Sequence, residues 1–200
     1  MELTEQFAYD WNDVRGWAPD TAANRISKSN FDLLIEYTRI IESWNETGNL
    51  LIERNSSDSE EAKDCNIAII SLGYIILGII LEFWLRAFLS VFYEDYIVDP
   101  CRYKTGTSKK SKDPANDMTL AELINYCSDP VKGIGSCRLH VLNDSTYRDW
   151  ADRIRRRRNA VHSFQAKTSS FTVKELSDDI EHLQPFIYGL IFQLPDPTDR

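Results

Sequence analysis

The sequence predicts an all-α fold, an up-and-down bundle of four to five main helices with an N-terminal extension. Apolar residues recur at helical spacing along most of the chain, capping residues precede several of these segments, and no useful length alternates polar with apolar residues. With 200 residues the chain is long enough for one domain with a substantial core. We expect an extension at residues 1–28 that packs on a bundle of residues 29–194, followed by a tail at residues 195–200.

The first helical segment begins near Ser29 and Asn30, both of which are residue types that cap helices. Apolar residues then recur at helical spacing, at Phe31, Leu34, Ile35, Ile41 and Trp44. The pattern continues to about residue 54, although Gly48 weakens it, and a polar connector follows at residues 55–61. The segment before this helix carries Phe7, Trp11 and Trp17, and we expect it to be partly helical.

The longest predicted helix runs from about residue 60 to residue 98 and ends before Pro100. It contains an uncharged apolar run, Ile67–Leu81, which is shorter than the roughly 20 residues of a membrane span. Glu82 and Arg86 follow this run directly. Three small residues inside it would let other helices approach closely: Ser71, Gly73 and Gly78. We therefore expect the central helix of a soluble bundle, and a membrane helix is the less favoured alternative.

Residues 101–117 have the composition of an exposed loop. Five basic residues precede the first acidic residue, Asp113, and these are Arg102, Lys104, Lys109, Lys110 and Lys112. A solvated connection is the favoured interpretation, and a loop that contacts phosphate is the alternative. Thr119 and Glu122 then form a capping box, which predicts a short helix to about Cys127. A turn-rich segment follows, marked by Pro130, Gly133 and Gly135.

Two further helices complete the predicted bundle. Ser145 is positioned to cap the first, whose apolar residues include Tyr147, Trp150, Ile154 and Val161. Thr172 and Glu175 form a second capping box, which opens a final helix that continues to about Ile191 and is kinked at Pro185. Aromatic residues on the helical stripes exceed what one small bundle needs, which indicates a buried subunit interface: Trp44, Phe83, Trp84, Phe88, Phe92 and Trp150.

The chain is acidic overall but contains one strongly basic segment. Lys and Arg number 23 and Asp and Glu number 31, so the formal net charge of −8 argues against a protein that coats nucleic acid nonspecifically. Within this acidic chain, five arginines occupy the six positions from Arg153 to Arg158. One interpretation is a helical interaction protein whose arginines only pair with acidic residues, such as Glu175, Asp178, Asp179 and Glu181.

The histidine downstream of the arginines indicates a second interpretation, which is chemical. Arg158 lies four residues before His162 and Arg155 lies seven before it, so the three share one stripe of a helix. Arg157 would join them if the helix loosens near Asn159. A guanidinium holds phosphate in a two-pronged contact, and an imidazole exchanges protons near neutral pH. Together they supply the minimum for cleaving a phosphodiester without a metal ion.

The segment from Arg156 to His162, followed by Ser163 and Phe164, resembles the Arg-x(4–6)-His signature of HEPN domains. Arg157 has four residues between itself and His162 and Arg156 has five, so both satisfy the spacing. Arg158 is one residue too close, although Arg158 and Asn159 look most like the Arg-Asn pair of that family. We therefore favour Arg157 as the functional arginine, with Arg158 as the alternative.

The resemblance implies a homodimer with a composite site that cleaves RNA and needs neither a metal nor another cofactor. The implied catalytic residues are Arg157, His162, Arg158 and Asn159, and the implied RNA-binding residues are Arg153, Arg155 and Arg156. Glu82 would support the site by orienting a motif arginine, or would simply pair with Arg86 one turn later. Many family members are toxins or antiviral defence effectors, and we expect any antitoxin to be a separate protein. Others are non-catalytic modules that bind RNA, a nucleotide or a partner protein.

The N-terminal residues carry no basic region followed by an apolar stretch, so we expect no signal peptide and a cytoplasmic location. The four cysteines include no CxxC pair. Scattered reduced thiols are therefore the favoured interpretation. A zinc site is the less favoured alternative, with the ligands Cys101, Cys127, Cys137 and His140.

Overall fold

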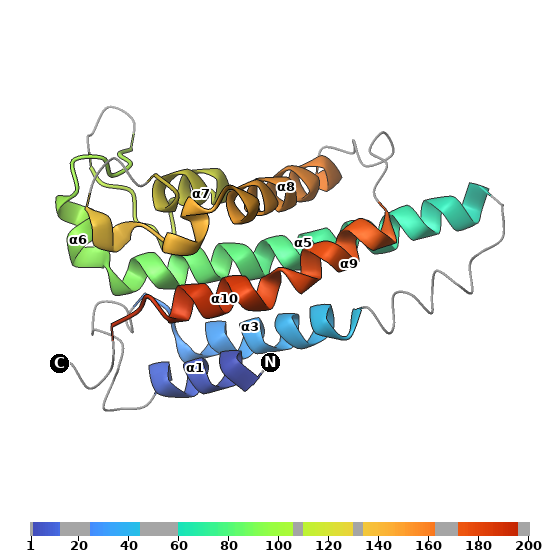
Figure 1. The fold of residues 1–200 in the computed structure, drawn as a ribbon, viewed down its shortest axis with the longest axis horizontal. Coiled ribbons are helices and arrows are strands. Elements are labelled where there is room, and N and C mark those ends of the chain that lie inside the picture. Colours follow the sequence, from blue (N-terminus) through green and yellow to red (C-terminus); the bar gives the residue numbers. More distant parts are fainter. Residues whose placement is uncertain are drawn as a thin grey trace.

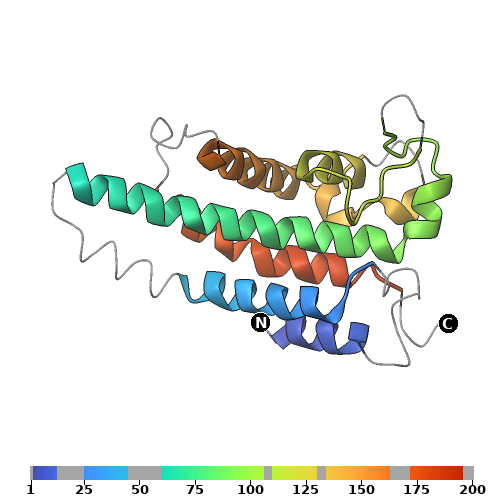
Figure 2. The ribbon, with the colours of Figure 1, turned by 180° about the vertical axis from the view of Figure 1, so that it is seen from behind.

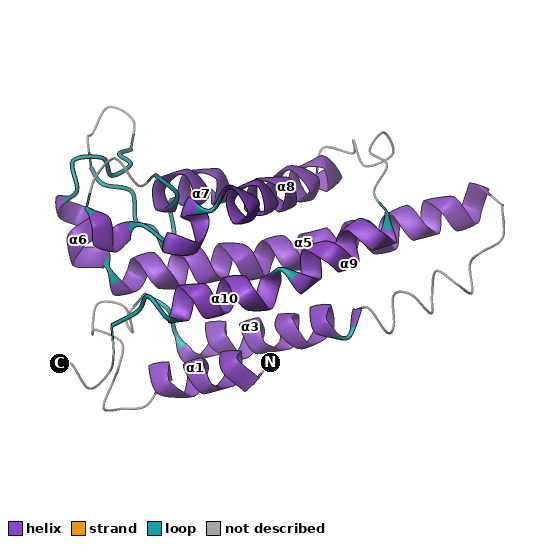
Figure 3. Ribbon diagram, in the orientation of Figure 1, coloured by secondary structure: helices purple, strands orange, loops and turns teal. Residues whose placement is uncertain are grey.

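The structure is a computed structural model that describes residues 2–12, 25–44, 60–105, 110–129, 134–162 and 172–195. These residues are predominantly helical (Figure 3), and their extended backbone forms an isolated bridge between Lys104 and Ser111 but no strand. The prediction of an all-α fold is therefore confirmed. Several sequence expectations fall outside the described residues: those for Trp17, residues 45–59, Lys109, Pro130, Gly133, Ser163 and Phe164.

Helix α5 is the central element, and the other helices pack around it (Figures 1 and 2). The elements in chain order are α1 Glu2–Asn12, α3 Lys28–Glu42, α5 Glu60–Val91, α6 Tyr93–Val98, α7 Leu120–Cys127, the 3₁₀ turns Gly135–Cys137 and His140–Asn143, α8 Ser145–His162, α9 Val173–Glu181 and α10 Leu183–Ile191. Helices α7 and α8 lie on one side of α5 and α3 on the other, with α1 outside α3 (Figure 1). Figure 2 shows α5 in front of α9 and α10, so these two helices cover its opposite face.

The core is rich in aromatic residues from distant parts of the chain. Trp84 and Phe88 of α5 and Trp150 of α8 are fully buried. Phe7 of α1 lies 5.1 Å from Trp84 and 5.8 Å from Phe31 between ring centroids. The core of a single chain therefore accounts for the burial of Trp84, Phe88 and Trp150, and these three residues do not require a subunit interface.

Small residues set how closely two helices approach α5. A Cβ atom on Gly73 would lie 2.6 Å from Cδ2 of Leu176, which belongs to α9. A Cβ atom on Gly78 would lie 2.6 Å from Cδ of Arg158, which belongs to α8. These contacts agree with the expectation that both glycines permit close helix approach. The absence of a side chain at Gly73 and Gly78 lets α9 and α8 cross α5 at these two positions.

Helix ends follow capping residues closely, but two caps differ from those expected. Ser29 and Asn30, expected to cap the first bundle helix, lie inside the first turn of α3, because the N-cap is Ser27, whose backbone N–H donates to Oδ1 of Asn30 at 2.9 Å. The Thr119 and Thr172 capping boxes are both formed, with reciprocal hydrogen bonds to Glu122 and Glu175. Asp144, rather than Ser145, caps α8, because its Oδ1 accepts a hydrogen bond of 2.8 Å from the backbone N–H of Thr146.

Two helices that the sequence predicts as continuous are each divided in the structure. The segment 60–98 breaks at Phe92, where the sequence offers neither glycine nor proline as a signal. The last segment breaks at His182, three residues before Pro185. Proline lacks an N–H group and its ring clashes with the carbonyl four residues earlier, so the kink expected at Pro185 becomes a break.

One segment within the described residues, Asn66–Val91, is long and apolar enough to cross a membrane by length and composition. More than half of its most apolar window is buried inside the bundle. The core helix of a soluble protein has the same properties, so this segment is weak evidence for a membrane protein.

We predict that Gly73→Val lowers the free energy of unfolding by about 1–3 kcal/mol, because the added atoms overlap Leu176 in a packed contact. Gly135→Val is the matched control, since no atom lies within 4 Å of a Cβ at that position. Urea unfolding of the three proteins measures the difference. Equal losses of stability in both variants would contradict the close contact between α5 and α9.

Candidate functional site at the arginines of helix α8

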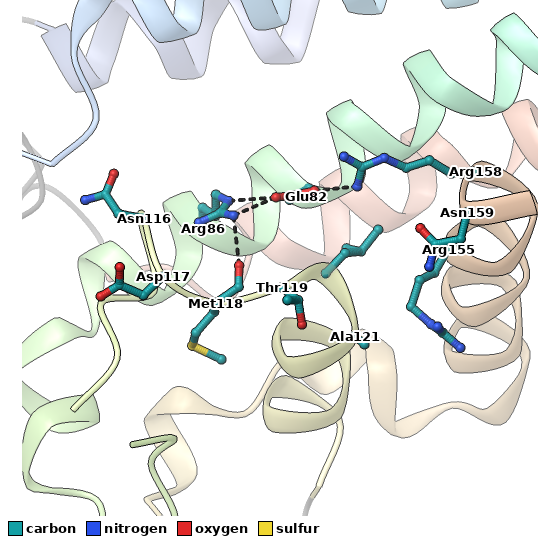
Figure 4. A pocket seen from close by; sticks show the side chains of 11 residues that line it. Glu82, Arg86, Asn116, Asp117, Met118, Thr119, Ala121, Arg155, Arg158 and Asn159 are labelled. Atoms are coloured by element: carbon teal, nitrogen blue, oxygen red, sulfur yellow. Dashed lines mark hydrogen bonds and ion pairs between the residues drawn. The ribbon is translucent and has the colours of Figure 1, made fainter. Parts of the chain in front are cut away.

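The arginines of helix α8 lie outside the apolar core because a different face of the helix is buried there. Trp150, Ala151 and Ile154 are fully buried against the bundle, which leaves the remaining faces to charged residues. Arg153 and Arg157, four apart, lie beside α9. Arg155 and Arg158, three apart, line a pocket between α5, α7 and α8 (Figure 4). The arginine cluster is therefore divided between two environments.

On the α9 side, the buried carboxylate of Asp179 is the centre of a hydrogen-bond network. It accepts bonds of 2.5 and 3.0 Å from Arg153 and one of 3.0 Å from the hydroxyl of Tyr74. Arg157 lies 3.6 Å from Asp179, donates to Glu175 at 2.8 Å, and also donates to the Tyr74 hydroxyl. Two guanidinium groups therefore meet two carboxylates, and this side is electrically balanced.

On the pocket side, one carboxylate serves two arginines. Glu82 accepts a bond of 2.5 Å from Arg158 at Oε2 and one of 2.6 Å from Arg86 at Oε1 (Figure 4). Both partners considered for Glu82 from the sequence are therefore present together. The aliphatic part of Arg158 crosses α5 at Gly78, one turn before Glu82, and this crossing lets the guanidinium reach the carboxylate.

A second carboxylate is shared in the same way. Asp152 lies 2.7 Å from Nη2 of Arg155 and 3.0 Å from Nε of Arg156. Every arginine of the cluster therefore pairs with an acidic side chain, as the purely ion-pairing interpretation predicts. Among the described residues the pairing is unequal, because the four guanidinium groups of Arg86, Arg155, Arg156 and Arg158 share two carboxylates, those of Glu82 and Asp152, which leaves an excess of positive charge there.

The pocket has a volume of about 430 Å³, which lies in the range of small-molecule sites. The polar and charged residues that line it include Glu82, Asn116, Asp117, Arg155, Arg158 and Asn159. The arginine end of the pocket combines uncompensated positive charge with guanidinium donors, which is the chemistry that binds phosphate.

The partners of Glu82 and Tyr74 fix their protonation states. Burial alone would raise the pKa of Glu82, but the hydrogen bonds from Arg86 and Arg158 outweigh it and hold the pKa below its ordinary value. Glu82 is therefore a carboxylate at neutral pH. Burial, followed by the charge of Asp179, raises the pKa of Tyr74, so its hydroxyl stays protonated and acts as a donor.

The structure separates the residues that the sequence grouped into one site. Arg155, Arg158 and Asn159 line the pocket, whereas Arg153 and Arg157 do not. The side chain of Arg156 is 65% exposed, and that of Arg157 is 14% exposed and enclosed by Tyr74, Glu175 and Asp179. His162 is the last residue of α8, and its side chain lies outside the described residues.

Sequence reasoning missed Tyr74 as a partner of the arginines, and it also missed Asn116 and Asp117 as part of the pocket. A signal for Tyr74 exists, because Tyr74, Gly78 and Glu82 are spaced four apart and form one stripe of α5 that faces α8. Asn116 and Asp117 carry no such signal, since their place depends on how the loop before α7 folds back.

The cysteines show no sign of a metal site in the part of the chain that the structure describes. No three or more His, Cys, Asp or Glu side chains there are arranged to hold a metal ion. Cys127 and Cys137 are buried, and Cys101 is exposed. Burial raises the pKa of the Cys137 thiol to about 11, so it remains protonated at neutral pH.

No family model, no curated protein and no solved structure matches this chain. Any functional conclusion therefore depends on the residues and contacts described above.

We predict that Asp179→Ala lowers the free energy of unfolding by about 2–4 kcal/mol, because it leaves Arg153 and Arg157 without their shared carboxylate. The expected loss of stability is smaller than for a fully buried ion pair because Arg153 is partly exposed. Asp178→Ala, at the exposed neighbouring position, is the control and should change stability by about 0.5 kcal/mol or less. If urea titrations give the two variants the same midpoint, Asp179 does not hold α8 to α9.

We predict that Glu82 makes the free energy of unfolding depend on pH in the acidic range. Its pKa is lower in the folded protein than in the unfolded chain, so its contribution is complete above about pH 4.3 and is lost as the pH falls further. Glu82→Gln should therefore lose less stability than wild type between about pH 5 and pH 3, as measured by urea unfolding. Glu181→Gln, at an exposed position, is the control and should follow the wild-type curve. Parallel curves for all three proteins would contradict the role of Glu82.

Proposed function

We propose that this chain is a cytoplasmic, metal-independent endoribonuclease of the HEPN type, and that it acts as a toxin or antiviral defence effector. The observation that carries the proposal is the pocket into which α8 brings Arg155, Arg158 and Asn159. The uncompensated positive charge at this end suits a phosphate of RNA. His162 follows Arg158 by four residues in α8, so the two share one stripe of the helix.

In the proposed reaction, Arg158 and Arg155 hold the phosphate whose ester bond is cleaved. The His162 imidazole removes the proton from the ribose 2′-hydroxyl, and the resulting oxygen attacks phosphorus. The bond from phosphorus to the 5′ oxygen breaks, which leaves a 2′,3′-cyclic phosphate. A protonated imidazole returns the proton to the departing 5′ oxygen, and a homodimer supplies the second imidazole for this step. The guanidinium groups stabilise the charge that accumulates on the phosphate oxygens.

The geometry favours Arg158 over Arg157 as the arginine that contacts phosphate. Arg158 lines the pocket, and its Nη1 donates a hydrogen bond to Glu82. Arg157 is engaged by Tyr74, Glu175 and Asp179 on the other side of the helix. Glu82 then acts as a positioning residue, since its charged carboxylate fixes the Arg158 guanidinium at the pocket wall.

We predict that purified protein cleaves RNA in the presence of EDTA, and that His162→Ala and Arg158→Ala each reduce the rate by about 10²- to 10⁴-fold. Arg156→Ala is the control, because Arg156 is mostly exposed and does not line the pocket. Cleavage is measured with a labelled RNA and folding with circular dichroism. Full activity in both folded variants would remove His162 and Arg158 from the site. If only Arg157→Ala loses activity, Arg157 is the arginine that contacts phosphate.

A second candidate function is a non-catalytic HEPN module that binds RNA, a nucleotide or a partner protein. It is favoured by the observation that each arginine of the cluster already has an acidic partner. Such a module would bind RNA in a salt-dependent manner and leave it intact. If the arginines serve ion pairing alone, the protein would show no affinity for RNA at any salt concentration.

The proposed homodimer and the separate antitoxin extend the same proposal. A composite site needs two copies of the pocket facing each other, so the protein should have the mass of a dimer in solution. A monomer at micromolar concentration in light scattering would count against the composite site.

A further inference from the structure

One side of α5 carries an apolar stripe that the described helices leave partly open. The stripe recurs every three or four residues, at Ala68, Leu72, Ile75, Ile79 and Phe83. Leu72 is 50% exposed, and Ile75, Ile79 and Phe83 are half-buried. The opposite side of α5 carries Gly73, against which Leu176 of α9 packs. The stripe therefore faces away from α9, toward the viewer in Figure 2.

Helix α3 extends this apolar surface on the same side of the molecule. Arg39 pairs with α1 and Glu42 accepts a hydrogen bond from α10, so one flank of α3 faces those two helices. Leu33, Tyr37 and Ile40 lie on the other flank, and Leu33 and Ile40 are 56% and 44% exposed. Because α10 lies behind α5 in Figure 2, this flank lies in front, beside the α5 stripe. We name the two stripes together the open face.

The open face has the size of the apolar part of a dimer interface. It is two helices wide, about 20 Å, and about 23 Å long, which gives roughly 450 Å² in outline. A standard interface covers about 800 Å² on each partner, and in homodimers about 65% of that area is apolar. Apolar patches of this size on a single chain are often functional.

Charge differs between the two ends of the α5 stripe. Beyond Phe83, Arg86 and Arg158 share the carboxylate of Glu82, so positive charge is in excess among these described residues. The other end of α5 begins with three acidic residues among five, whose side chains lie outside the described part: Glu60, Glu61 and Asp64. A second copy turned end for end sets opposite charges against each other, whereas a parallel copy sets like charges together.

The contacts between α3 and α5 show which residues lie at the middle of the open face. The rings of Phe31 and Phe83 are 5.1 Å apart, so these two residues lie at the same level of the bundle. The two helices run in opposite directions (Figure 1). Ile40, nine residues after Phe31, therefore lies near the level of Ile75, whereas Leu33 lies about 10 Å further along.

Helix α8 brings its last residue to the same level. It also runs opposite to α5 (Figure 1), and Arg158 crosses α5 at Gly78. The backbone of His162 lies four residues beyond Arg158, a distance of about 6 Å along the helix. It is therefore close to the level of Ile75, at the middle of the open face.

We infer that a second copy of this chain packs on the open face, with the two α5 helices antiparallel about a two-fold axis near Ile75. The axis lies in the interface at right angles to α5, so α3 meets the partner's α3 and α8 meets the partner's α8. Both His162 backbones then lie at the level of the axis, with the arginine ends of the two pockets on either side of it. The interface itself does not need the proposed ribonuclease function, but the shared cleavage site rests on it.

The first experiment measures mass by sedimentation equilibrium. Wild type should be a dimer of the 23.1 kDa chain at micromolar concentration. Leu72→Glu should weaken the dimer at least about 30-fold, because association buries a carboxylate against apolar side chains. Tyr188→Glu is the control, since Tyr188 is 54% exposed on α10, behind α5, and should leave the dimer intact. Circular dichroism checks that both variants fold. A monomeric wild type, including one that binds phospholipid vesicles, or a dimer that only Tyr188→Glu dissociates, overturns the inference.

The second experiment tests the antiparallel arrangement with a short bismaleimide cross-linker. Cys65 and Cys101 are first replaced by serine, because Cys101 is exposed and the side chain of Cys65 lies outside the described residues. Ile40→Cys should then cross-link to its counterpart near the axis. Leu33→Cys, on the same flank of α3, is the matched control and should not react across the interface, since the two copies lie about 20 Å apart. A dimer in which neither cysteine cross-links, or in which both do equally, overturns the arrangement.

The third experiment separates the interface from the function. RNA cleavage by wild type, Leu72→Glu and Tyr188→Glu is compared at a concentration where Leu72→Glu is monomeric. Loss of cleavage in Leu72→Glu alone supports the shared site. Full cleavage by the monomer overturns the shared site and leaves the ribonuclease proposal intact. A dimer that Leu72→Glu dissociates but that never cleaves RNA supports the interface and overturns the ribonuclease proposal.

Discussion

The crossing of α8 over α5 at Gly78 is the contact on which the rest of the site depends. The aliphatic part of Arg158 occupies the space that a side chain at position 78 would fill, and its guanidinium then meets Glu82 one turn further along α5. Glu82 is half-buried and would be costly to keep charged alone, so it needs the donors of Arg158 and Arg86. Because these requirements meet at one point, the crossing fixes both the position of α8 and the arginine end of the pocket.

The ion pairs of Asp179 and those of Asp152 differ in how much stability is lost when they are broken. The Asp179 network is buried, so breaking it leaves charge without compensation inside the protein, and it serves to hold α8 to α9. The pairs of Asp152 with Arg155 and Arg156 are partly exposed neighbours on one helix, and such pairs are worth only about 0.2–1 kcal/mol. A phosphate can therefore compete for Arg155 at little cost. The ion pairs on the pocket side are therefore compatible with the proposed binding of RNA, whereas those on the α9 side are not.

The same distinction explains how an acidic chain can carry a local excess of positive charge, as the proposed binding of RNA requires. The formal net charge of −8 is an average over the chain, whereas the carboxylates that meet the α8 arginines are distributed unequally. The α9 side is balanced, and the excess positive charge lies where Arg155 and Arg158 line the pocket. An acidic surface repels the RNA backbone elsewhere, so binding would be confined to this end of one pocket.

The sequence by itself determined the all-α class, the two capping boxes at Thr119 and Thr172, and the segment that carries the arginines, because helical periodicity and capping are local properties. It did not determine the break at Phe92 or the capping of α8 by Asp144, where packing and turn geometry decided between neighbouring positions. Only the tertiary structure decided which arginine faces the pocket. Arg157 and Arg158 differ by about 100° around α8, and the rotation of that helix is set by contacts with Tyr74 and Gly78, about eighty residues earlier in the chain. No local pattern contains that rotation, since it arises only when α8 packs against α5.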